Sequence, residues 1–204
     1  MKHRILSGTM VVWTVALIVS GIAPYDRLTW YMEVAPVLLA APVLIATRDT
    51  LPLTRLAYVL ICAHGLILIA GGAYSYARVP LGLWVRDWLD LDRNPYDRLG
   101  HLAQGFVPAI VVRELLLRVF AFARGNFLFF IVVCICLAVS AGYELIEWGA
   151  ALLLGQGASE FLATQGDEWD TQWDMFLALL GSIISLLIFS RFHDRQLEAM
   201  TSRP

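Results

Sequence analysis

The stretch from Thr164 to Ser190 reads TQGDEWDTQWDMFLALLGSIISLLIFS and joins an acidic start to a long apolar run. Residues 174–190 are long enough to cross a bilayer, because a transmembrane helix needs about 17–25 mostly apolar residues. Three aspartates, Asp167, Asp170 and Asp174, stand at the threshold of this span at spacings of three and four. They either face water at the start of a helix or converge on a cation.

The composition of the whole chain points to a membrane protein. The chain has 204 residues, of which 59% are hydrophobic and 16% charged, and its mean hydropathy is +0.68. Soluble domains carry about 25% charged residues. We therefore predict a single all-α domain, residues 1–204, built as a polytopic transmembrane helical bundle. Cys62, Cys134 and Cys136 lie inside apolar runs, which argues against disulfides and against a thiolate metal site.

Six apolar segments predict six spans, at residues 5–23, 33–47, 54–74, 99–120, 127–154 and 174–190. The second segment is short and contains Pro36 and Pro42, so five spans plus a re-entrant segment also fit. The first segment follows a basic start, as in a signal peptide, but we interpret it as an uncleaved helix. With the N-terminus inside, ten lysines and arginines fall on the cytoplasmic side and five on the other. This bias predicts that both termini are cytoplasmic.

The acids of the last two spans have helical spacing. Glu144 and Glu147 lie about 60° apart on one helix face, and the three aspartates form one stripe if a helix starts near Gly166. A hairpin of the fifth and sixth spans would turn the two sets toward each other. Buried carboxylates are costly unless they are paired, protonated or bound to a cation. Most acids lie on the side opposite the termini. The bias of lysine and arginine toward the cytoplasm does not explain this, because acids barely influence topology.

We therefore predict a divalent-metal site that faces outward. Carboxylates suit Mg²⁺, Mn²⁺ or Ca²⁺, and a histidine at the start of the fourth span extends the choice to Zn²⁺ and Fe²⁺. Mg²⁺, Mn²⁺ or Zn²⁺ is the expected cofactor. The predicted metal ligands are Glu144, Glu147, Asp167, Asp170, Asp174 and His101, and of these Glu144, Asp170 and His101 are the predicted catalytic residues.

The motif PYDRL occurs twice, at residues 24–28 and 95–99. Its arginines, Arg27 and Arg98, are predicted to bind the phosphate of a substrate, because a guanidinium can bind phosphate through two hydrogen bonds. The other residues predicted to bind substrate are Asp26, Asp97 and Glu33.

Simpler structural roles remain open for each candidate. The aspartates could cap a helix and favour the positive end of its dipole. Glu144 and Glu147 could form salt bridges with Arg27 or Arg98. His64 fits a core histidine, and Glu114 with Arg118 fits a favourable pair one turn apart.

Four segments resemble a known family. PYDRLTWYMEVAP (residues 24–36), YDRLGHLAQGF (96–106), YELIEW (143–148) and QGDEWDTQWDM (165–175) are similar to signature segments of bacterial YjdF-like inner-membrane proteins, a domain of unknown function. The resemblance implies a multi-pass protein of the bacterial inner membrane and supplies no activity. The spacing of the aspartates also resembles that of CDP-alcohol phosphotransferases, but the DG-x-x-AR core of that family is absent.

The function that we expect is metal-dependent hydrolysis or transfer on a lipid or a lipid-linked phosphate. Membrane lipid is the expected partner, and nucleic acid is not. Two other classes stay open at this point, a proton- or cation-coupled transporter and a non-catalytic accessory protein. Transporters usually bind near the middle of the membrane, whereas these acids lie toward one end of their spans.

Overall fold

The computed structural model describes residues 2–154 and 164–201, and this part of the chain is all-helical. Its helices are α1 (Lys2–Ile22), α2 (Arg27–Thr47), α3 (Arg55–Tyr74), α4 (Pro80–Leu89), α5 (Tyr96–Arg118), α6 (Asn126–Leu154) and α8 (Asp170–Thr201). All except α4 are long and apolar enough to cross a membrane. The predicted class and the six spans are therefore confirmed.

Two helices are longer than the apolar pattern predicts. The second span is a full helix of 21 residues, because the carboxylate of Asp26 accepts a hydrogen bond from the Thr29 amide and starts α2 at Arg27. Pro36 and Pro42 lie inside this helix. The last span, α8, has 32 residues and continues through a charged segment to Thr201. Hydropathy alone misses this extension, since the segment after Ser190 is polar.

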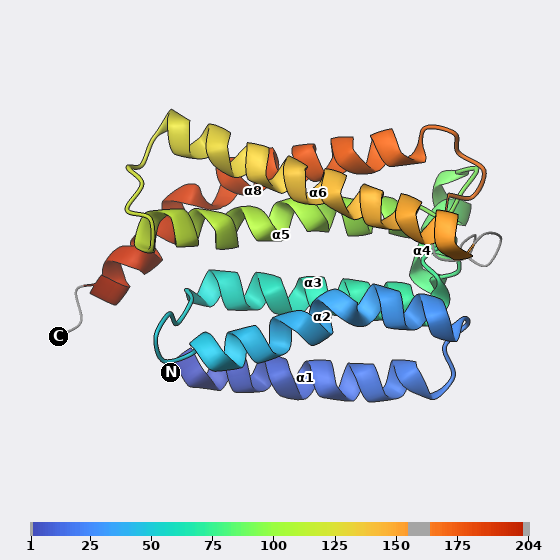
Figure 1. Ribbon diagram of the computed structural model, residues 1–204, viewed down its shortest axis with the longest axis horizontal. Coiled ribbons are helices and arrows are strands. Elements are labelled where there is room, and N and C mark those ends of the chain that lie inside the picture. The colour runs from blue at the N-terminus through green and yellow to red at the C-terminus, as the bar shows by residue number, and fades with distance from the viewer. Residues whose placement is uncertain (1, 155–163, 202–204) are drawn as a thin grey trace.

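The helices form two groups (Figure 1). In the view shown, α1, α2 and α3 make the lower group, and α5, α6 and α8 make the upper group. Contacts between α3 and α5 join the two groups. The first residues of α1 and the last described residues of α8 lie at the same end of the bundle. Helix α4 lies at the opposite end, where α5 and α8 begin. The side of the membrane on which each end lies stays a prediction.

The end of the bundle that holds α4 carries exposed aromatic side chains. Trp84 and Trp88 of α4 stack with their ring centroids 6.1 Å apart, and both are exposed. Trp148, Trp169 and Trp173 are exposed as well. Tryptophan favours the boundary between lipid and water, so this end of the bundle fits an interfacial position for α4.

The closest helix pair is α5 and α8, which pack through small residues. A methyl group added at Gly181 would stand 2.2 Å from the backbone oxygen of Leu102, so the two backbones are in contact there. Buried Ala109, Ala178 and Ser182 continue the same interface. Small residues allow this approach in membranes, where van der Waals packing drives the association of helices. This contact brings the first turns of α5 and α8 together.

Candidate metal centre

His101 of α5 lies at the centre of a buried polar cluster. Its Nδ1 atom lies 3.0 Å from the side-chain oxygen of Gln104. An amide oxygen only accepts hydrogen bonds, so Nδ1 carries the proton and the opposite nitrogen, Nε2, has a free lone pair. Gln104 therefore fixes both the orientation and the tautomer of the ring.

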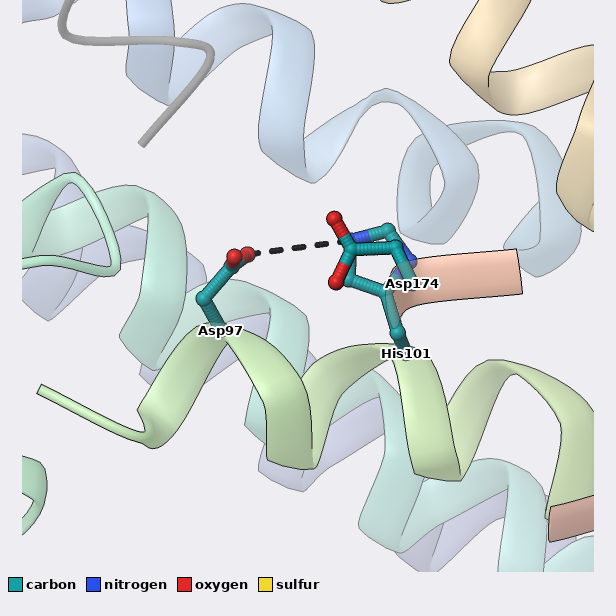
Figure 2. A group of neighbouring side chains, drawn as sticks. All are labelled: Asp97, His101 and Asp174. Carbon is teal, nitrogen blue, oxygen red and sulfur yellow. Dashed lines mark ion pairs between the residues drawn. The ribbon is translucent and has the colours of Figure 1, made fainter. Parts of the chain in front are cut away.

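Two carboxylates face this lone pair, as Figure 2 shows. Nε2 of His101 lies 3.7 Å from Oδ1 of Asp97 and 3.6 Å from Oδ2 of Asp174. These separations are too long for hydrogen bonds, and electron-rich atoms that face one another repel unless a proton or a cation lies among them. With metal bonds of about 2.0–2.6 Å, ligand atoms around one ion stand roughly 3.0–3.7 Å apart. The two separations from His101 fall at the upper end of this range, and one ligand atom from each of the three residues lies within 4.8 Å of the others.

Glu144 and Glu147 of α6 also approach this histidine. Oε1 of Glu144 lies 3.8 Å from Nδ1 of His101, and one ligand atom from each of the two glutamates and the histidine falls within 4.8 Å of the others. Oε1 of Glu144 and Oδ1 of Asp174 are buried and have no hydrogen-bond partner among the described residues. A buried, unpartnered carboxylate oxygen is costly, so each is a candidate ligand atom.

A cavity of about 230 Å³ lies beside the cluster. Asp97, His101 and Glu147 line it, together with Glu33 of α2. Glu33 is 4% exposed and lies next to the hydroxyl groups of Tyr76 and Tyr143. The predicted substrate residues Glu33 and Asp97 therefore lie at this cavity, and Asp97 also belongs to the group that faces His101.

Arg93, which precedes α5, was not predicted as a site residue and neutralises several of the acids. Its NH2 group lies 3.2 Å from Oδ2 of Asp97, and its NH1 group contacts Asp170 and lies 3.3 Å from Asp167. Arg98 donates a 2.9 Å hydrogen bond to Asp167 and lies over the ring of Trp173. The side chains of Asp167 and Asp170 thus face arginines, and Asp97 shares Arg93 with them while its other oxygen lies near His101.

The start of α8 corrects the predicted acidic stripe. The helix begins at Asp170, not near Gly166. Asp167 lies in the preceding turn, where its Oδ1 accepts a hydrogen bond from the Trp169 amide. That bond, reinforced by the nearby guanidinium groups of Arg98 and Arg93, lowers the pKa of Asp167. Only Asp170 and Asp174 therefore lie one turn apart on α8, and Asp174 alone of the three aspartates reaches His101.

The first PYDRL motif holds a turn together. Arg27 donates a 2.6 Å hydrogen bond to the carbonyl of Gly21 and a longer one to that of Ile22, at the end of α1. Asp26 caps α2, and the hydrogen bonds from Thr29 lower the pKa of its carboxyl group. Both predicted substrate residues thus have structural partners, and neither lines the cavity beside His101.

A second buried polar cluster lies at the other end of α5 and α8. Glu114 and His193 have no exposed surface, and Nε2 of His193 lies 3.0 Å from Oε2 of Glu114. Glu114 also accepts hydrogen bonds from Arg118 and from the amide and hydroxyl of Thr54, which caps α3. Helical spacing predicts only the pair of Glu114 with Arg118. This cluster ties α3, α5 and α8 together.

The comparisons with known proteins agree with the fold. The family described as predicted membrane protein (DUF2238) matches residues 5–195. The chain is also similar to the inner membrane protein YjdF of Escherichia coli (strain K12), with 52% identity over 197 residues, which is 97% of this chain and 94% of that protein. No solved structure matches the chain. With its six apolar helices, it is a multi-pass protein of the bacterial inner membrane. The chain belongs to the DUF2238 family of predicted membrane proteins.

Proposed function

We propose that this protein binds a divalent cation through Asp97, His101 and Asp174, with Glu144 and Glu147 beside the ion. The observation that carries the proposal is the lone pair of His101, which faces two carboxylate oxygens at 3.6 and 3.7 Å. A ligand set of one imidazole and several carboxylates suits Mn²⁺ or Zn²⁺, and the carboxylates also suit Mg²⁺.

The charges around the ion support the same proposal. Asp174, Glu144 and Glu147 form no ion pair with an arginine among the described residues, whereas Asp97, Asp167 and Asp170 do. Asp174 is 2% exposed and Glu144 is 6% exposed. A bound cation would offset the cost of desolvating these acids.

The reaction that we propose is hydrolysis or transfer at the phosphate of a lipid or a lipid-linked substrate. The bound ion would lower the pKa of a water molecule and polarise a phosphoryl oxygen. Glu144 would accept the proton of that water, because its Oε1 atom is buried, unpartnered and next to His101. Arg98 would meet the phosphate, since its side chain is 35% exposed at the edge of the cluster, against 12% for Arg93.

The first experiment measures the metal content of the full-length protein, purified in detergent, by elemental analysis. We expect about one Mn²⁺, Zn²⁺ or Mg²⁺ ion per chain after equilibration with each ion, and its loss in Asp174→Asn. Glu168→Gln is the matched control, because Glu168 is exposed and lies in the same segment. A protein free of metal, whose thermal stability ignores chelators, would overturn the proposal.

Gln104 provides a second test, since it orients His101 without touching the ion. Outer partners of metal ligands typically contribute 10–100-fold to affinity. We expect Gln104→Leu to lose roughly that factor, and Gln104→Glu to retain binding because its carboxylate still accepts the proton of Nδ1. Equal affinities in both variants would show that His101 is not a ligand. Release of inorganic phosphate from phosphatidic acid, or from a polyprenyl phosphate, tests the reaction itself.

A further inference from the structure

A second cavity continues from the one beside the metal centre. It has a volume of about 300 Å³, and the two cavities share Pro36, His64, Leu68 and Pro108. These residues come from α2, α3 and α5, so the joint lies where the two groups of helices meet (Figure 1). Apart from His64, the side chains around the second cavity are apolar or small, with Trp13 among them.

Two prolines lie at the joint between the cavities. Proline lacks a backbone N–H and cannot pack like other residues inside a helix. Pro36 of α2 and Pro108 of α5 both lie within their helices and line both cavities. The cavities also open sideways, because Val139, which lines the first, is 51% exposed, and Val43, which lines the second, is 60% exposed. In a membrane these openings face hydrocarbon.

The depths of the residues define an order along the bundle. His101 is five residues from the start of α5, and His64 is ten residues from the end of α3, at the same end of the molecule. At 1.5 Å per residue these positions lie roughly 8 Å and 15 Å deep. The second cavity then follows α3 from Gly65 and His64 toward Leu53, which just precedes that helix. Going inward from the metal centre, the proposed cation therefore comes first, His64 second and the apolar cavity third.

His64 offers one unused polar atom on this path. Its Nε2 is buried and has no hydrogen-bond partner among the described residues. A polar atom that is buried without a partner is costly, and an ester carbonyl on an occupant would satisfy it. The hydrocarbon chain of a polyprenyl phosphate carries no such acceptor at this depth.

We propose that the two cavities bind a single ester-linked phospholipid. Its phosphate lies at the cation held by Asp97, His101 and Asp174, an ester carbonyl accepts a hydrogen bond from His64, and one acyl chain fills the second cavity. An apolar cavity stays dry and accepts an apolar occupant. The lining therefore favours a hydrocarbon chain over a path for ions, which would need polar groups along its length. The placement of the phosphate rests on the proposed function.

The test uses the full-length protein in nanodiscs, irradiated with lipids that carry a diazirine in the middle of the chain. The probes are a diacyl phosphatidic acid, its ether-linked analogue and a polyprenyl phosphate. We expect the diacyl probe to label peptides that contain residues 36–44 and 61–68. Ala40→Phe fills the second cavity and should abolish this labelling. Leu39→Phe is the matched control, because Leu39 is 70% exposed and does not line the cavity.

A second variant examines the ester contact. His64→Leu should remove the preference for the diacyl probe over the ether analogue while leaving the metal content unchanged. Equal labelling by the diacyl, ether and polyprenyl probes in the unmodified protein would overturn the inference, and so would labelling that survives Ala40→Phe. Thermal unfolding of each sample, compared with the unmodified protein, shows that the variants are folded, and metal content is measured alongside.

The same measurements separate this inference from the proposed function. Bound metal without labelling of the cavity peptides would overturn the lipid site and leave the metal centre standing. Labelling without metal would overturn both the metal centre and the position assigned to the phosphate.

Discussion

A methyl group added at Gly105 of α5 would stand 1.8 Å from the backbone oxygen of Ala178 on α8. The two helices therefore touch backbone to backbone four residues after His101 and four residues after Asp174. This contact sets the separation of those two side chains, because both project from the adjacent turn.

Gly105→Ala should consequently lower both the stability of the protein and the affinity of the proposed metal centre. Forcing a methyl group into a packed interface costs typically about 1–3 kcal/mol, and a clash with backbone leaves little room to adjust. We expect a lower melting temperature in detergent and a loss of bound metal. Gly142→Ala on α6 is the control, because a methyl group there meets nothing within 4 Å. Equal melting temperatures and equal metal contents in the two variants would contradict the close packing of α5 against α8 at Gly105.

Arg93→Gln should destabilise the end of the bundle where α5 and α8 begin. The change leaves Asp97, Asp167 and Asp170 without this guanidinium, and removing one partner of a buried ion pair costs about 3–5 kcal/mol. Arg98→Gln should cost less, since exposed pairs contribute about 0–1 kcal/mol. Thermal unfolding of both variants measures the difference. Adding Asp170→Asn to Arg93→Gln should recover part of the loss, and no recovery would mean that the pair is not coupled.

Glu114→Leu should loosen the junction of α3, α5 and α8. It removes an acceptor from Thr54, Arg118 and His193, all of which donate to Glu114. Arg113 donates to Nδ1 of His193, so Nε2 carries the proton that Glu114 accepts. We expect a loss of about 3–5 kcal/mol in the free energy of unfolding. Glu198→Leu is the control, because Glu198 forms an exposed ion pair with Arg124. It should change the free energy of unfolding by less than about 1 kcal/mol. Comparable effects would contradict the structural role of Glu114.

Asp26→Asn should change the acid sensitivity of the turn between α1 and α2. The pKa of Asp26 is lower in the folded protein than its unfolded value of about 3.9. Its charge therefore contributes stability above pH 4, and this contribution is lost as the pH falls through the folded pKa. Asparagine still caps a helix, so the variant should be less stable by about 0.3–1 kcal/mol at pH 7. Urea unfolding at pH 7 and pH 2 tests this, and a difference that persists at pH 2 would contradict it.

The helices were predictable because hydropathy and length alone identify membrane spans. The meeting of Glu144 with His101 also followed from spacing, since acids one turn apart on a buried helix must face the interior. Spacing could not show that Asp167 and Asp170 face Arg93. That pairing depends on the loop that places Arg93 ahead of α5, and loop geometry leaves no periodic signal.

The buried pair of Glu114 and His193 could not be predicted from the sequence, for a different reason. The two residues are 79 positions apart, and their meeting depends on the register between α5 and α8. That register is set by Gly105 and Gly181, which read as ordinary glycines until the facing backbone is known. For Arg27 the sequence motif suggested a role that the local contacts do not need. The motif suggested that Arg27 binds phosphate, whereas its side chain donates hydrogen bonds to the carbonyls at the end of α1.

The division of the bundle into two groups of helices separates two tasks. The residues proposed to hold the ion all come from α5, α6 and α8, whereas α2 and α3 supply walls of the adjoining space. A small outward tilt of the first three helices would widen the sideways entrance and leave every ligand in place. If the proposed ion and lipid both bind, a lipid would therefore enter or leave between the two groups of helices while the ion stays with α5, α6 and α8.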